Sequence, residues 1–521
     1  MKKRNRIVAR FVAMALTSGS WVGSALAGGT STGLIPLTQL SGQYQGFEGG
    51  LYPGGGNTLP SAHLAAGLSR AAQVQPRDPA GNPDPNGWIV MISVGMSNTT
   101  HEFGAFERQE DANPNRNARL IIINGAHGGQ TASAIRDPGA PYWQLIDERL
   151  NTMGLARPQV QVVWLKEANA NPPNDFPGHA QALSQDLRAV VQVLKDRFPN
   201  VQICYLSSRI YGGYAAGGLN PEPQAYEGAF SVKWLIQDQI NGAADLNFDP
   251  AAGVVEAPWL AWGPYLWADG LTPRASDGLI WVQADLESDG THPSGSGEQK
   301  VADITSGFFH SDSTAAPWYS ARPGLSLRVI DAAADVHVSQ AQPSQNFGSA
   351  SALLLAGGAS ASNVYLKFDV SSVVEPILLA KLSFRAGGSG SARAMIHTVD
   401  DDSWMESAVN WNNAPAVSGA PLVTTGTISR DGSISANVTP AVLSDPDRIV
   451  SFRLSTTTAS ANGYISKEGG QPPRLILVVQ SAAGPGSIPT VSSLGVFSLA
   501  LLLVAWGSII LRRGPRPNLP G

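Results

Sequence analysis

The sequence predicts an α/β domain built on a parallel sheet, followed by an all-β antiparallel sandwich and a C-terminal transmembrane helix. Continuous apolar strands alternate with helical patterns over residues 88–310, as in a parallel sheet covered on both faces. Strands with period-two alternation follow over 326–480. An uncharged apolar segment lies near the end of the chain. A length of 521 residues suits two or three domains of this kind.

The composition narrows the class of protein. The chain is 43% hydrophobic and 14% charged, and its net charge is −5. This balance offers no polybasic surface, so we expect no nucleic-acid partner. The single cysteine, Cys204, lies in the apolar run "VQICYLSS", where a buried side chain is expected. No intramolecular disulfide is possible, and stability must come from core burial.

The first 27 residues have the pattern of a secretory signal peptide. Five basic side chains precede an apolar stretch that begins at Phe11, and Ala25-Leu26-Ala27 forms an A-x-A cleavage site. An amphipathic first helix is the alternative, but the polar run from Thr17 to Ser20 breaks its periodicity. We therefore expect an exported protein whose mature chain starts near Gly28. Residues 28–87, rich in glycine and aromatic side chains, are expected to form a lead-in segment that wraps the next domain.

The α/β domain is predicted over residues 88–310. Its strands are expected at 88–94, 118–124, 159–165 and 201–208. Helical spacing of Leu183, Leu187, Val191 and Leu194 predicts a helix between the last two strands. A final helix carries apolar side chains at 301, 304 and 308, with Ser296 and Gln299 at the spacing of a capping box.

Two runs of small residues and prolines separate the remaining parts of the chain. The first, 311–325, predicts a linker, and the second, 481–487, predicts a spacer. Between them, 326–480 contains short strands such as "NVYLKFDVSS", where apolar and polar side chains alternate, and no convincing helix. This pattern predicts the sandwich.

The C-terminal segment has the order of a membrane sorting signal. Val491–Leu511 is uncharged and long enough to cross a bilayer, and Arg512 and Arg513 follow it, which places this end in the cytoplasm. With Ile488-Pro489-Thr490 in front, residues 488–513 resemble the IPTL-type sorting signals of Gram-negative bacteria. The resemblance implies a sorting peptidase as a partner and a location in the cell envelope or outside the cell, anchored transiently or permanently. Val491 stands where that family usually has leucine.

Three polar residues are candidates for catalysis. Asp289 and His292 lie three positions apart in the loop "SDGTHPSGSG", where a carboxylate can orient an imidazole that moves protons. Ser97 follows the first predicted strand, beside the amides that open the next helix. The alternatives are a turn in which Asp289 caps its own backbone and a helix cap at Ser97. All three residues fall at the C-terminal edge of the predicted sheet.

Together these elements resemble the SGNH (GDSL-like) hydrolase superfamily over about residues 85–310. The blocks that carry the resemblance are "GMSNT" at 95–99 and "DGTHP" at 289–293, in the chain order Ser, Asp, His. The resemblance implies a flavodoxin-like three-layer fold of the SGNH type and ester hydrolysis. It assigns Ser97 as nucleophile, His292 as base and Asp289 as its orienting partner, with neither metal nor cofactor.

Parts of the family pattern are altered in this chain. Met96 replaces the usual Asp before the nucleophile. The second block, "NGAHGGQTAS", offers Gly128 or Gly129 for the oxyanion hole, and we take Gly129. The third block reads "KEANANP", so its oxyanion asparagine is best matched by Asn169. His101 and Glu102, after the nucleophile, are expected on a solvated helix face.

Residues 331–480 resemble the DNRLRE-type β-sandwich, which is also grouped as a carbohydrate-binding module family. The most specific part is Trp404 and Glu406 followed by Asn410-Trp411-Asn412. The resemblance implies a polysaccharide partner, while the two tryptophans are expected in the core. The sequence therefore predicts an exported, surface-associated serine esterase that acts on acylated carbohydrates. The alternative is a non-catalytic cell-surface or matrix polysaccharide-binding protein on an SGNH-like scaffold.

Overall fold

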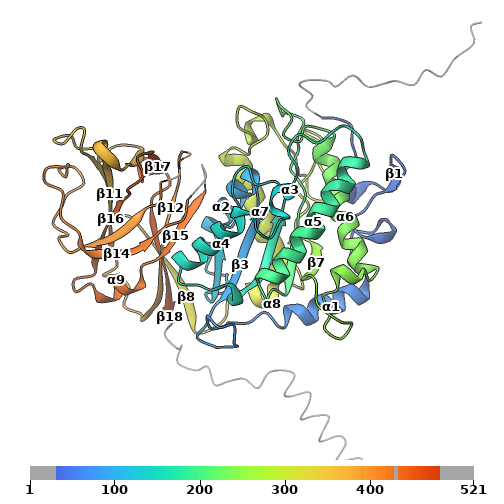
Figure 1. The fold of residues 1–521 in the computed structure, drawn as a ribbon, viewed down its shortest axis with the longest axis horizontal. Coiled ribbons are helices and arrows are strands. Elements are labelled where there is room, and N and C mark those ends of the chain that lie inside the picture. The colour runs from blue at the N-terminus through green and yellow to red at the C-terminus, as the bar shows by residue number, and fades with distance from the viewer. Residues whose placement is uncertain (1–30, 389, 391, 428–431, 482–521) are drawn as a thin grey trace, which may run out of the picture.

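The computed structural model describes residues 31–388, 390, 392–427 and 432–481 (Figure 1). The predicted signal peptide, 1–27, and the predicted sorting segment, 488–513, lie outside these ranges. Among the helices that the model describes, none is long and apolar enough to cross a membrane.

A five-stranded parallel sheet forms the centre of the first half of the chain (Figure 1). Its order is β4-β3-β5-β6-β7, from strands β3 (Ile89–Gly95), β4 (Leu120–Ile123), β5 (Val160–Lys166), β6 (Ile203–Leu206) and β7 (Trp259–Trp262). Every residue in these strands is buried, which explains the continuous apolar runs in the sequence. The prediction of a parallel sheet is confirmed. Strand order changes direction beside β3, and ligands of such sheets bind at the C-terminal edge of this point.

Helices cover both faces of the sheet, and the two sets have different neighbours. Toward the sandwich lie α2 (Ser97–Asp111), α4 (Pro141–Thr152) and α7 (Gly295–Ser311) (Figure 1). On the other face lie α5 (Gly178–Arg197) and α6 (Gln224–Ile240), while α3 (Ala132–Ile135) contacts α5. The apolar positions predicted in α5 are buried in the core.

The start of α7 differs from the prediction. The N-cap is Ser294, and Ser296 lies in the first turn. The Ser296 hydroxyl donates to the carbonyl of Ala284 and bonds the carboxylate of Asp285. The capping box expected from Ser296 and Gln299 is therefore wrong, because the preceding loop already uses this hydroxyl.

Two segments outside the α/β core pack onto it. Residues 31–87 contain β1 (Gln43–Tyr44), β2 (Phe47–Glu48) and α1 (Ser61–Ala71), and Leu37 and Tyr52 are buried in the same core as the sheet. The stretch 311–325, expected as a linker, contains α8 (Ala316–Tyr319), in which Trp318 and Tyr319 are fully buried. The chain between the two halves of the molecule is thus part of the folded core.

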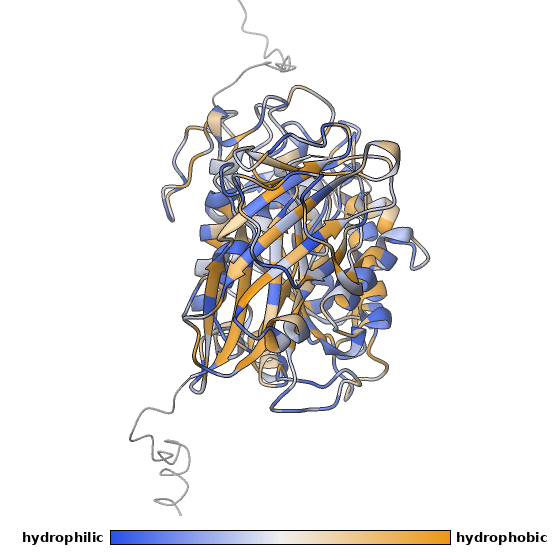
Figure 2. Cartoon of the chain, turned by 90° about the vertical axis from the view of Figure 1, so that its left-hand side faces the viewer, coloured by the Kyte–Doolittle hydropathy of each residue, from blue (hydrophilic) through white to orange (hydrophobic). Residues whose placement is uncertain are grey.

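The second half of the chain is an antiparallel sandwich, as predicted (Figure 2). Its sheets have the orders β14-β13-β16-β11-β9 and β15-β12-β18-β8, with a further pair β10-β17. The strands are β8 (Leu325–Asp331), β9 (Ala334–Ser339), β10 (Ala352–Leu355), β11 (Ser362–Asp369), β12 (Ile377–Arg385), β13 (Met395–Val399), β14 (Ser418–Thr424), β15 (Ser433–Asn437), β16 (Ile449–Ser455), β17 (Asn462–Ile465) and β18 (Arg474–Gln480). A short helix, α9 (Thr439–Ser444), was not predicted. Hydrophobic and hydrophilic residues alternate along the strands, as Figure 2 shows.

The sheet that contains β12 is buried on both faces. Ala380, Leu382 and Phe384 belong to the interior of the sandwich. On the opposite face, Leu379 joins the core of the α/β domain, together with Ile476 and Val478 of β18. The sandwich is therefore docked on the α/β domain through this sheet face, on the side that carries α2, α4 and α7 (Figure 1).

Candidate active site

Ser97 is held at the junction between β3 and α2. Gly95 ends the strand, Met96 is extended (φ −96°, ψ −156°), and the helix begins at Ser97. A Cβ atom on Gly95 would lie 2.4 Å from Oγ1 of Thr99, so this tight turn requires glycine. The Thr99 hydroxyl donates to the carbonyl of Lys166 at the end of β5 (2.6 Å), which fixes the first turn of α2 against the sheet edge.

The loop before α7 orients the Asp289 carboxylate. Oδ1 of Asp289 accepts the backbone N–H groups of Thr291 (2.9 Å) and His292 (3.0 Å). Oδ2 lies 2.5 Å from Nδ1 of His292. Gly290 has φ +65°, and a Cβ there would lie 1.8 Å from the carbonyl oxygen of Tyr214. Glycine is needed at this turn for both reasons. The turn-capping alternative and the imidazole contact are thus both present in this loop.

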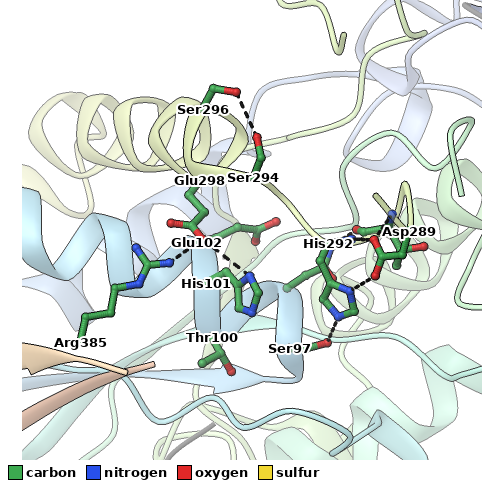
Figure 3. Close-up of polar contacts among 12 residues, drawn as sticks. Ser97, Thr100, His101, Glu102, Asp289, His292, Ser294, Ser296, Glu298 and Arg385 are labelled. Carbon is green, nitrogen blue, oxygen red and sulfur yellow. Dashed lines mark hydrogen bonds and ion pairs between the residues drawn. The ribbon is translucent and has the colours of Figure 1, made fainter. Parts of the chain in front are cut away.

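The side chains of Ser97 and His292 join the two segments. Nε2 of His292 lies 2.8 Å from Oγ of Ser97, although the residues are 195 positions apart (Figure 3). The Asn98 amide donates to the carbonyl of Thr291 (2.9 Å) and ties the start of α2 to the loop. The three predicted side chains therefore form a continuous row, carboxylate to imidazole to hydroxyl, at the C-terminal edge of the sheet.

The row is partly open to solvent. The side chains of His292 and Asp289 are 21% and 45% exposed. Burial alone would raise the pKa of Asp289, but the hydrogen bonds from the His292 ring and from the two backbone amides outweigh it and lower that pKa. Asp289 is consequently a carboxylate at neutral pH, as an orienting partner of imidazole must be.

The two residues predicted for an oxyanion hole have different surroundings. Gly129 is exposed in the loop after β4, with φ +77°. The Asn169 amide donates to Oδ2 of Asp186 on α5 (2.7 Å), and its oxygen accepts the N–H of Ser133 on α3 (2.9 Å). One N–H of Asn169 is thereby committed to Asp186, and at most one remains for a substrate.

Sequence reasoning misplaced the residues behind Ser97. His101 and Glu102, expected on a solvated helix face, are both buried, His101 against α7 and Glu102 against the end of β5. Glu102 pairs with Lys166 (2.7 Å), and His101 lies against the His292 ring. Helical spacing held a signal for His101, since residues four apart share a face and His101 follows Ser97 at that distance.

Aromatic side chains near the strand edge are mostly packed. Trp267 and Tyr211 are fully buried, and Trp267 donates its indole N–H to Glu222 (2.8 Å). Trp404 of the sandwich is also buried, as expected, and the ammonium of Lys367 lies 4.5 Å from its ring centroid. These rings contribute to the cores and not to an exposed sugar-binding platform.

Two groups of carboxylates in the sandwich have oxygens within 4.8 Å of one another, Asp335-Glu406-Glu468 and Asp402-Asp445-Asp447. The first group already holds a cation, since Nζ of Lys467 lies 2.5 Å from Glu406 and 3.6 Å from Glu468. Glu406, from the Trp404-x-Glu406 motif, also accepts the N–H of Asp335 (2.9 Å). Glu406 therefore ties the loop that carries this motif to β9 and to the segment after β17.

Burial, with the nearby charges of Glu468 and Glu406, raises the pKa of Asp335 to about 7. The folded chain keeps this proton at pH values where the unfolded chain has released it, so stability falls as pH rises from about 4 to about 7. Over this range we expect the free energy of unfolding to fall by about 2–4 kcal/mol. Asp335→Asn should remove much of the slope while matching the unchanged protein near pH 4. Urea unfolding at a series of pH values measures this, and an unaltered slope would contradict it.

Comparison with known proteins adds a match to the sandwich. Residues 328–480 match the model of Carbohydrate-binding module family 96, which confirms the predicted likeness to a carbohydrate-binding module. No match was found among curated proteins.

Solved structures with low similarity include a carbohydrate esterase family 3 protein from Talaromyces cellulolyticus, 12% identical, covering 42% of this chain and 93% of that chain (TM-score 0.25). A GDSL-like lipase from Bacteroides thetaiotaomicron VPI-5482 is 11% identical, covering 47% and 95% (TM-score 0.24). The periplasmic domain of a lipopolysaccharide acetyltransferase from Salmonella ser. Paratyphi A is 13% identical, covering 47% and 94% (TM-score 0.24). Likenesses at this level carry no conclusion about the activity of this chain.

Proposed function

We propose that this protein is an exported serine ester hydrolase that removes acyl groups from carbohydrates. The observation that carries the proposal is the row Asp289–His292–Ser97, with contacts of 2.5 Å and 2.8 Å. A carboxylate, an imidazole and a serine hydroxyl in this order are the parts of a nucleophilic acyl-transfer site.

The reaction follows from these contacts. As Oγ of Ser97 attacks the ester carbonyl, Nε2 of His292 takes the hydroxyl proton, and Asp289 holds the Nδ1–H and stabilises the imidazolium. The negative oxygen of the tetrahedral intermediate is stabilised by the Ser97 amide at the start of α2, the Gly129 amide and the remaining N–H of Asn169. His292 then returns its proton to the departing alcohol. Water, activated by the same imidazole, releases the acid from Ser97.

The class of substrate is supported by the sandwich and not by the row itself. The match to a carbohydrate-binding module favours esters carried on a polysaccharide. The signal-like residues 1–27 and the sorting-like residues 488–513 favour export to the cell envelope of a Gram-negative bacterium. There, the C-terminal segment would anchor the chain as a membrane helix, transiently or permanently, and a sorting peptidase would recognise it.

A fluorophosphonate probe tests the proposed nucleophile. The probe reacts with serine hydroxyls that an adjacent base activates. We expect one labelled peptide containing Ser97, located by mass spectrometry, and competition by short-chain p-nitrophenyl esters and acetylated polysaccharide. Protein denatured before labelling is the control and should remain unlabelled at Ser97. Absence of both labelling and hydrolysis, with retained binding to polysaccharide, would favour the non-catalytic alternative.

A further inference from the structure

A second imidazole lies beside the one that contacts Ser97. The ring centroids of His101 and His292 are 5.5 Å apart, with the planes inclined by 31°. Figure 3 shows the His101 ring between His292 and Glu298. His101 is only 4% exposed, so a charge on its ring would act on His292 with little screening by water. The charge state of His101 therefore matters for any proton transfer at His292.

A buried ion pair beside His101 includes a residue of the sandwich, Arg385. Nδ1 of His101 lies 3.7 Å from Oε1 of Glu298 on α7. The same carboxylate oxygen accepts a hydrogen bond from Nη2 of Arg385 on β12, at 2.7 Å. Glu298 and Arg385 are 4% and 6% exposed. A buried row thus runs from the sandwich to the catalytic imidazole: Arg385, Glu298, His101, His292 (Figure 3).

We infer that Arg385 is a positioning residue for the ester-hydrolysing site, because it neutralises Glu298 and so keeps His101 uncharged beside His292. This inference rests on the proposed function. His292 must become positive when it takes the Ser97 proton, and a second cation 5.5 Å away would oppose that step. A buried carboxylate needs a cation, and Arg385 is closer to Glu298 than His101 is. With Arg385 present, the negative charge of Glu298 is neutralised by the guanidinium, and the His101 imidazole stays neutral.

Other charges around the two rings are balanced without Arg385. On α2, Glu102 pairs with Lys166 of β5. Asp289 bonds His292 from its own loop. Further charged groups act on these elements, among them Arg209 after β6, Arg474 on β18, and Arg108 on α2, which also acts on Glu298. Glu298 is the carboxylate that links His101 to Arg385 of the sandwich.

Arg385→Met tests the inference by leaving Glu298 without its guanidinium. Glu298 should then draw a proton onto His101, and kcat at pH 7 should fall about tenfold or more while KM changes little. The deficit should narrow as pH rises, because His101 then loses its charge. Arg385→Lys should retain most of the activity, and the double variant Arg385→Met with Glu298→Gln should recover most of kcat.

Lys381→Met is the matched control. Lys381 lies on the same strand and face as Arg385 and also makes buried ion pairs with α2, but its partners are Glu107 and Asp111. Assayed where circular dichroism shows it to be folded, this variant should keep the unchanged kcat. An equal loss in both variants, a deficit independent of pH, or no recovery in the double variant would overturn the inference and leave only a role in docking.

Titration of His101 gives a readout that does not depend on hydrolysis. In protein with 13C-labelled histidine, the His101 ring signal, assigned with His101→Asn, should titrate at higher pH in Arg385→Met than in the unchanged protein. An unaltered titration would overturn the inference even if the protein is an esterase. Conversely, an unchanged protein that hydrolyses no ester and takes no fluorophosphonate would refute the proposed function while the titration still reports on the Arg385–Glu298–His101 row.

Discussion

Replacing Ser97 with alanine is expected to lower kcat for ester hydrolysis by about 10³- to 10⁶-fold, with little change in stability. The hydroxyl lies 2.8 Å from Nε2 of His292 and is the group that attacks the ester in the proposed reaction. The helix start does not depend on it, because the Met96 carbonyl accepts the N–H of Thr100 and the Asn98 and Thr99 side chains hold the turn. The loss should therefore appear in kcat and in fluorophosphonate labelling.

Ser294→Ala is the matched control for this experiment. Ser294 lies two residues after His292, and its hydroxyl donates to the carbonyl of Ala284 instead of contacting the imidazole. This variant should keep activity of the same order as the unchanged protein. Hydrolysis at equal rates by the Ser97→Ala variant would show that another group is the nucleophile, and the proposed mechanism would fail.

The largest effect on stability is expected for Lys381→Met. Nζ of Lys381 lies 2.8 Å from both Glu107 and Asp111 in the interface between β12 and α2, where all three side chains are buried. Removing the ammonium leaves two carboxylates together without their shared cation, and breaking a buried pair in this way costs about 3–5 kcal/mol. Urea unfolding followed by tryptophan fluorescence should show the loss.

Two further variants separate charge from packing at this interface. Arg393→Met breaks an interdomain pair with Glu148 whose arginine is 46% exposed, and this change should cost less than about 1 kcal/mol. Adding Glu107→Gln to Lys381→Met removes one of the two carboxylates, while Asp111 keeps its ion pair with Arg116, and should restore part of the stability. A Lys381→Met variant as stable as Arg393→Met would contradict the importance of this buried group.

The proximity of Ser97, Asp289 and His292 was predictable because the relevant patterns are local or topological. Ser97 follows an apolar strand, and the Asp289/His292 loop precedes the last helix, so a parallel sheet brings both to one edge. The contacts of Asn169 were not predictable, because its amide is used by Asp186 and Ser133 from helices whose positions the sequence does not specify.

The interface between the α/β domain and the sandwich could not be predicted from sequence patterns. On β12, Lys381 and Arg385 alternate with Ala380, Leu382 and Phe384, and polar side chains on alternate positions predict a solvated face. In the structure this face is covered by α2 and α7, and its charges are matched by acidic residues of those helices. His101 was misjudged for a similar reason, because Glu298 of α7 lies between it and Arg385 of the sandwich. Only the tertiary arrangement reveals which polar faces are paired with each other.

The docking of this sheet face also fixes the position of the Asp289–His292–Ser97 row relative to the sandwich. This face is buried in the core of the α/β domain through Leu379, Ile476 and Val478. The segment that joins the two halves is itself packed in that core through helix α8. An enzyme on a flexible tether can sample many positions along a polymer while its anchor stays bound. Here the packed interface keeps the distance between the sandwich and Ser97 constant, so in the proposed function the two could not move apart along a polysaccharide.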